Sequence, residues 1–70
     1  MKNIIFIPGS FSPFHDGHYS MISEFISDNN EIHIIVSSKN RDNINTDNIV
    51  SFINKIFEKY NNVIVHKVDI

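Results

Sequence analysis

Short apolar runs alternate along the chain with longer segments whose apolar residues recur at helical spacing. The apolar run at residues 3–7 ends at Pro8-Gly9, as in a strand that is buried on both faces. Glu31–Ser37 and Val63–Val68 are equally short and rich in β-branched residues. The pattern therefore predicts three strands.

Two segments with helical periodicity lie between these strands. The first follows a turn-rich loop and continues until Asp28-Asn29-Asn30, and the second extends from Thr46 to the break at Asn61-Asn62. We expect Thr46 to be the N-cap of the second helix, with Asp47 favourable near the positive end of the helix dipole. The periodic residues are His18, Ile22, Phe25 and Ile26 in the first helix, and Ile49, Phe52, Ile53, Ile56, Phe57 and Tyr60 in the second, where we expect them to form core.

The element order β-α-β-α-β predicts an α/β fold. Because crossovers between parallel strands are right-handed, the sheet order should be 3-2-1 with both helices on one face, a Rossmann-like half of a doubly wound fold. The first strand then lies at an open edge, although Ile4 and Phe6 point to one face and Ile5 and Ile7 to the other. We expect the second face to be covered, either by a further α/β half of the same chain or by self-association.

Composition excludes several classes of protein. Seventy residues make one domain, and the absence of cysteine rules out disulfides and leaves structural zinc without its usual ligands. The net charge is −2 with the two signs interspersed, so we expect no nucleic-acid partner. The apolar runs are far shorter than the ~20 residues that span a bilayer, and the N-terminus has no signal-peptide pattern. A cytoplasmic protein without a membrane partner fits these features best.

The candidate chemistry is concentrated in residues 9–18, between the first strand and the first helix. Ligands of open α/β sheets bind beyond the carboxyl ends of the strands, where a helix N-terminus offers free N–H groups to an anion. His15 and His18 could converge on one phosphate, and Gly17 would allow a close backbone approach. Two histidines are too few for a zinc site, and the chain has too few glycines for G-x-G-x-x-G or a Walker A loop.

This segment resembles the G-x-F-x-P-x-H-x-G-H signature of the HxGH nucleotidyltransferases, which include adenylyltransferases and cytidylyltransferases. The matching residues are Gly9, Phe11, Pro13, His15, Gly17 and His18. The resemblance implies that residues 1–70 are a single nucleotidyltransferase-like domain, forming the N-terminal part of a longer domain. A second phosphate motif of the family, an Ile-Ser-Ser-Thr-x-x-Arg-like segment, is absent from these residues.

The resemblance also implies roles for individual residues. His15 and His18 would be catalytic, stabilising charge on the α-phosphate as an acceptor phosphate displaces pyrophosphate. Ser10 and Lys39 would contact the acceptor or the phosphates, with Arg41 competing for the role of Lys39. The magnesium ion would be held mainly by the triphosphate, so we assign no protein ligand to a metal. The expected nucleotide-phosphate-binding residues are Gly9, Ser10, Phe11, Gly17 and His18.

The sequence is therefore interpreted as a nucleotidyltransferase that transfers a nucleotidyl group from ATP or CTP to a small phosphorylated acceptor, with ATP favoured. The alternative is a noncatalytic nucleotide-phosphate-binding or protein-interaction remnant of the same fold. Ser10 could equally be a turn hydroxyl that bonds its own backbone. His33 and His66 lie within predicted strands and are interpreted as packing or edge residues.

Overall fold

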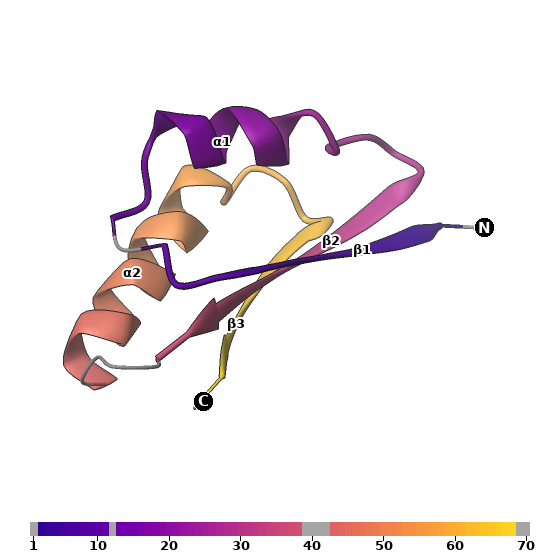
Figure 1. Cartoon of the computed structure of the whole chain (residues 1–70). Helices are drawn as coiled ribbons and strands as arrows, with labels where there is room; N and C mark the ends of the chain where they lie inside the picture. Colours follow the sequence, from indigo (N-terminus) through magenta and orange to yellow (C-terminus); the bar gives the residue numbers. More distant parts are fainter. Residues whose placement is uncertain (1, 12, 39–42, 69–70) are drawn as a thin grey trace.

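The computed structural model describes residues 2–11, 13–38 and 43–68, and it confirms the predicted order of elements. Figure 1 shows the strands and the helices arranged in two layers. The elements are β1 (Asn3–Gly9), α1 (Asp16–Ser23), β2 (Asn30–Ser37), α2 (Asn43–Ile56) and β3 (Val63–Val68).

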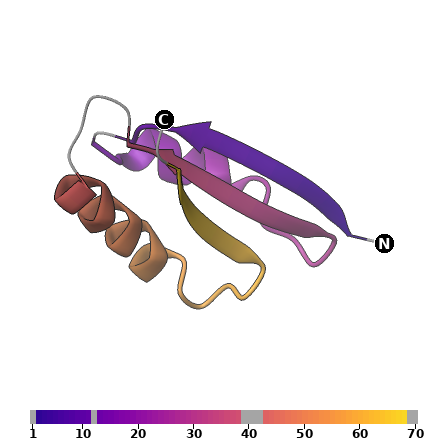
Figure 2. The ribbon, with the colours of Figure 1, turned by 90° about the horizontal axis from the view of Figure 1, so that it is seen from below.

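The sheet is parallel throughout, with β2 in the centre and β1 and β3 at the edges. This order, β1-β2-β3, is the predicted 3-2-1 order viewed from the other side. Ile5 pairs with Ile32, which in turn pairs with Val63. Both helices cover the same face of the sheet, as Figures 1 and 2 show. Because the strands are parallel, all of them end at the same edge of the sheet.

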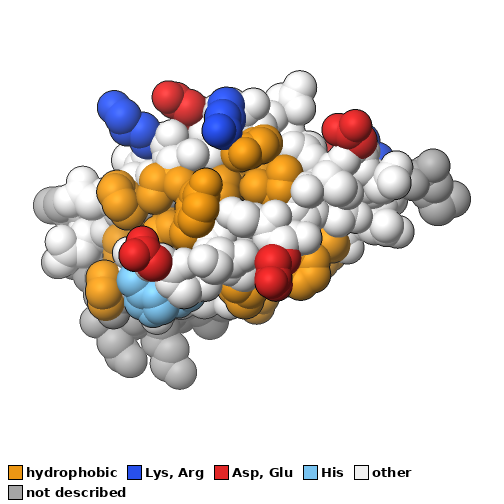
Figure 3. Space-filling view, turned by 90° about the horizontal axis from the view of Figure 1, so that it is seen from above, with side chains coloured by type: hydrophobic (Ala, Val, Ile, Leu, Met, Phe, Trp, Pro, Cys, Tyr) orange, Lys and Arg blue, Asp and Glu red, His pale blue; other side chains and the backbone are white. Residues whose placement is uncertain are grey.

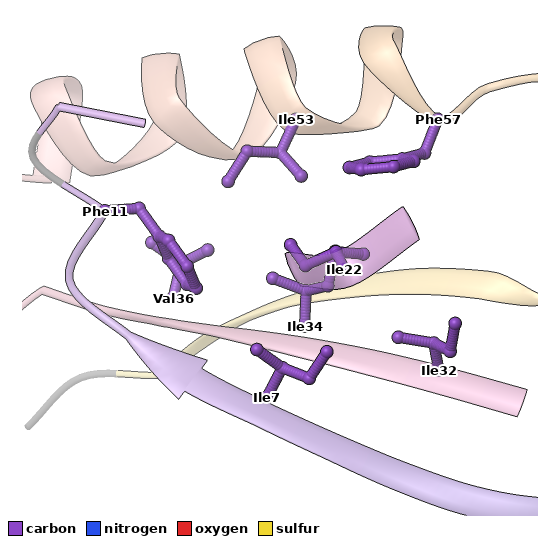
Figure 4. Packing of buried hydrophobic residues seen from close by; sticks show 8 residues of the cluster. All are labelled: Ile7, Phe11, Ile22, Ile32, Ile34, Val36, Ile53 and Phe57. Atoms are coloured by element: carbon purple, nitrogen blue, oxygen red, sulfur yellow. The ribbon is translucent and has the colours of Figure 1, made fainter. Parts of the chain in front are cut away.

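The hydrophobic core lies between this face and the helices. Alternate residues of β2 point into it, because successive side chains of a strand face opposite sides. Ile22 of α1 and Ile53 of α2 are completely buried against them. Figure 4 shows the core residues Ile7, Phe11, Ile22, Ile32, Ile34, Val36, Ile53 and Phe57.

The helix boundaries differ from the prediction. Helix α1 ends at Ser23 because the amides of Phe25 and Ile26 bond to carbonyls three residues back, which tightens the chain into a turn. Helix α2 ends at Ile56 and a turn follows, closed by the bond from the Tyr60 amide to the Phe57 carbonyl at 2.9 Å. Apolar residues of both turns still pack on the core, so the apolar periodicity continued past the helix ends.

The predicted N-cap at Thr46 is wrong. Helix α2 begins at Asn43, so Thr46 lies within the first turn, where its side chain is completely buried. Asp47 accepts a hydrogen bond from the Lys67 ammonium at 2.9 Å and so ties α2 to β3. Phe52, predicted to be core, is instead 53% exposed, whereas Phe57 is buried. The fold therefore keeps the predicted helix but rotates part of its aromatic stripe toward solvent.

The other face of the sheet has no covering layer in the described part of the chain. Ile4 and Phe6 of β1 are 57% and 64% exposed there. His33 of β2 lies beside them and its ring centroid is 5.5 Å from that of Phe6. The exposed apolar side chains of an edge strand make this face suited to contact with another protein layer.

Candidate functional site

A hollow of about 300 Å³ lies where β1 ends and α1 begins. It is open at the carboxyl edge of the sheet, where ligands of such folds bind. Figure 3, seen from the helix side, shows histidine side chains reaching the surface beside exposed hydrophobic ones. The lining residues are Pro8, Gly9, Ser10, Phe11, Pro13, His15, His18 and Met21.

A larger hollow of about 570 Å³ lies at the end of α2 and the start of β3. None of the predicted site residues described here lines it, and it faces the opposite end of the sheet from the motif. The smaller hollow therefore carries the candidate chemistry. The larger one is lined by Ser51, Asn54, Lys55, Phe57, Glu58, Tyr60, Asn61 and Val63.

His15 is the N-cap of α1. Its backbone is extended, and its Nδ1 accepts a hydrogen bond from the backbone N–H of Gly17 at 3.1 Å. In return, the backbone N–H of His15 donates to Nδ1 of His18 at 3.2 Å. This reciprocal arrangement is a capping box in which both side chains are imidazoles. The motif therefore starts the helix as well as forming the site.

The capping box determines where the imidazole protons lie. Each Nδ1 accepts a backbone N–H, so neither Nδ1 of the neutral rings carries a proton, and the proton is on Nε2 in both. The two rings are nearly parallel, with centroids 3.9 Å apart. Each of the two stacked rings thus keeps an Nε2–H as a donor at the N-terminus of a helix, which itself favours an anion.

The charge state of His18 follows from its surroundings. Burial lowers the pKa of His18 below its ordinary value, and the neighbouring His15 lowers it further. Neutral His18 is therefore the prevailing form at neutral pH, and it offers an N–H donor rather than a full positive charge.

The two glycines of the motif make room for aromatic rings. A Cβ on Gly9 would lie 3.0 Å from the ring of Phe11, which folds back over the strand end. Phe11 has a φ of 51°, which is uncommon for a residue with a side chain, and its ring is buried in the core. Burial of this ring offsets the backbone strain and fixes the loop that carries Ser10. Phe11 therefore shapes the site from within the core.

The remaining predicted residues divide into two groups. Ser10 is exposed at the mouth of the hollow, where it can reach a ligand. Lys39 and Arg41 lie outside the described residues, so their predicted contacts are not tested. Among the residues that the structure describes, the lining includes no lysine or arginine and no carboxylate. An anion in this hollow would thus be held by N–H donors, and no group of three His, Cys, Asp or Glu within the described ranges could hold a metal ion.

Sequence reasoning missed three residues that contribute to the site. Pro8 and Met21 line the hollow, and Phe14 packs against His18 with ring centroids 5.4 Å apart. Phe14 occupies a variable position of the motif, and only its spacing of four residues before His18 could have indicated the contact. Met21 lies one helical turn after His18, a spacing that places both on one face.

Comparison with known proteins agrees with the motif. The family model described as cytidylyltransferase-like matches residues 6–67, nearly the whole chain. No curated protein matches the sequence significantly. Among the described residues, no helix is long and apolar enough to cross a membrane.

Proposed function

The chain belongs to the cytidylyltransferase-like family of HxGH nucleotidyltransferases, and from this premise we propose that it serves nucleotidyl transfer from ATP or CTP to a small phosphorylated acceptor. An acceptor phosphate oxygen attacks the α-phosphorus of the triphosphate and forms a new P–O bond. The bond from the α-phosphorus to the bridging oxygen breaks, and pyrophosphate leaves with the electron pair. The proposal favours ATP as the donor and the cytoplasm as the location.

One observation carries this proposal, namely the paired Nε2–H donors of His15 and His18 at the start of α1. Their Nδ1 atoms are already engaged by the backbone, so the rings are oriented before a ligand arrives. Donors held in place stabilise charge that develops on phosphate oxygens without having to reorganise during the reaction. In this proposal both imidazoles bind the phosphates and stabilise the transition state, with no covalent intermediate.

The donor substrate in this proposal is the magnesium complex of the nucleotide. The described part of the lining has no carboxylate, and these residues offer no site for a resident ion. Magnesium bound to the triphosphate would reduce its charge, which matters in a hollow lined by neutral donors. Gly9 and Phe11 shape the loop beneath the phosphates, and Gly17 keeps the helix start accessible.

The acceptor is proposed to bind at the mouth of the hollow, beside Ser10. The exposed hydroxyl of Ser10 can donate to an acceptor phosphate. We propose Lys39, which stands two residues after the end of β2 in the sequence, as the accompanying cation.

The second candidate is a noncatalytic nucleotide-phosphate-binding or protein-interaction module. The observation that favours it is the uncovered face of the sheet, where Ile4 and Phe6 are more than half exposed. A nucleotide-phosphate-binding module also predicts phosphate binding at His15 and His18, whereas a protein-interaction module does not. Only the enzyme predicts turnover.

The test is a calorimetric titration of the chain with Mg·ATP and Mg·CTP, repeated with His15 and His18 both replaced by alanine. Binding that is lost in the double variant supports the site, and the tighter nucleotide identifies the base. Release of pyrophosphate with a set of phosphorylated acceptors then separates the enzyme from the binding module. If neither nucleotide binds the unmodified chain, the proposal fails for these residues.

A further inference from the structure

The imidazole of His18 lies within a group of three other rings. The His15 ring is 3.9 Å away at 24°, the Phe14 ring 5.4 Å away at 29°, and the Phe11 ring 5.0 Å away at 80°. Two of these rings are nearly parallel to His18 and the third meets it edge-on. These are the arrangements that aromatic pairs favour. His18 is therefore packed as well as hydrogen-bonded.

These ring contacts restrict the rotation of the His18 imidazole about its bond to Cβ, which the capping box constrains only weakly. The bond from the His15 backbone to Nδ1 of His18 is 3.2 Å long, which is near the upper end for an N–H donor. A half-turn of the His18 ring would put a ring carbon in the place of Nδ1 and break this hydrogen bond. A ring packed face to face hinders such a turn, because the turning edge must pass through its neighbour.

Phe14 is itself supported by α2. Its ring meets Phe52 at 6.2 Å and 76° and the buried Phe57 at 6.4 Å and 87°, both edge to face. The loop residue Phe14 thus joins the second helix to the first turn of α1.

We propose that Phe14 is a positioning residue, whose ring holds the imidazole of His18 in the orientation that presents Nε2–H to a phosphate. The inference rests on the proposed function, because it gives Phe14 a purpose at the same site. Phe14 itself does not line the hollow, so it acts through His18 rather than on the ligand. Desolvation by the surrounding rings also agrees with the lowered pKa of His18.

The test compares Phe14→Leu with Phe6→Leu. Both remove an aromatic ring and keep an apolar side chain, but Phe6 lies on the opposite, uncovered face of the sheet. Proton–nitrogen NMR spectra report which nitrogen of His18 carries the proton and the pH at which the ring titrates. Titration with Mg·ATP and Mg·CTP reports affinity.

We expect Phe14→Leu to give a mixture of the two neutral forms of the His18 imidazole. We also expect it to raise the pKa of His18 toward the ordinary value. Affinity should fall roughly three- to tenfold, as for the loss of one or two aromatic contacts. Phe6→Leu should change neither property, and Phe14→Tyr should restore both. If Phe14→Leu does not fold by circular dichroism, Phe14→Met provides the same comparison with less loss of volume.

Unchanged proton position and titration of His18 in a folded Phe14 variant would overturn the inference. This outcome is separate from failure of the proposed function, which is the absence of nucleotide binding by the unmodified chain. The NMR measurement needs no nucleotide, so it decides the role of Phe14 toward His18 in either case.

Discussion

The imidazole of His15 occupies the space that a side chain at Gly17 would need. Its Nδ1 accepts the Gly17 N–H at 3.1 Å, and a Cβ on Gly17 would lie 2.9 Å from Cε1 of the same ring. The φ of Gly17 is not positive, so an ordinary residue could adopt its backbone conformation. Glycine is needed here for the close approach of the ring, not for a special turn.

Gly17→Ala is therefore expected to separate binding from folding. Alanine within a helix is favoured over glycine by about 1 kcal/mol, which offsets the loss of the His15 cap, so stability should change little. The Cβ must displace the His15 ring, and losing its bond to a charged phosphate should cost about 1.5–3 kcal/mol, or roughly tenfold or more in affinity. Calorimetric titration with the magnesium nucleotides and thermal unfolding measure the two effects.

Ser20→Ala is the matched control for Gly17→Ala, because Ser20 is an exposed residue of the same helix away from the hollow. It should leave affinity unchanged. A Gly17→Ala variant that binds nucleotide as tightly as the unmodified chain would contradict the assignment of His15 to the site.

Replacing His15 should affect stability and binding differently according to the new side chain. His15→Ala removes the N-cap and is expected to destabilise the fold by about 1 kcal/mol. His15→Ser keeps an oxygen that can accept the Gly17 N–H, so its stability should stay close to that of the unmodified chain. Both variants lose the imidazole, and both should therefore bind the nucleotide equally weakly. Urea unfolding measures the stability of the two variants and calorimetry measures their affinity. If the more stable variant also binds the nucleotide more tightly, the prediction is contradicted.

The order of elements and the sheet could be predicted from the sequence because burial requires them. A strand such as β2, with Ile32, Ile34 and Val36 all buried, can lie only beneath a covering layer. The motif histidines could be placed at the sheet edge for the same topological reason. Their capping box could not be predicted, because histidine is not among the usual N-cap residues.

Local contacts explain the predictions that were wrong or missing. Apolar spacing extended both helices too far, since the turns after Ser23 and Ile56 also bury apolar side chains. Asn62 was expected only to break a helix, yet its amide donates to the carbonyls of Ser27 and Asn30, both at 2.9 Å. These two hydrogen bonds join segments that are far apart in the sequence, so no local sequence pattern could have predicted them.

The lowered pKa of His18 predicts a loss of stability in acid. The unfolded chain, with its imidazole near the ordinary value of 6.5, takes up the proton before the folded chain does. The stability due to neutral His18 is thus fully present above pH 6.5 and is lost as the pH falls through the lower pKa of the folded state. Urea unfolding between pH 8 and pH 5 measures this loss.

His18→Gln isolates the contribution of His18 from those of the other histidines. Glutamine is a usual partner at this position of a capping box, so it can accept the His15 N–H without titrating. The variant should lose less stability than the unmodified chain over the same pH range. If the free energy of unfolding changes equally with pH in the two proteins, the surroundings of His18 do not disfavour its charged form.

The uncovered face of the sheet predicts self-association that a single charge should weaken. Phe6 is 64% exposed on an edge strand, beside exposed Ile4, and apolar side chains gathered in this way are driven together in water. Phe6→Lys places a strongly hydrated ammonium there, as edge strands do when they avoid pairing.

We therefore expect Phe6→Lys to lower the sedimentation coefficient and the binding of a hydrophobic dye. Phe52→Lys is the matched control, because Phe52 is 53% exposed but lies on α2, on the helix side of the molecule. It should leave the sedimentation coefficient unchanged. If the unmodified chain sediments as a monomer and binds no dye, the uncovered face does not drive association. If Phe52→Lys dissociates the protein as well as Phe6→Lys does, the contact surface lies over the helices instead.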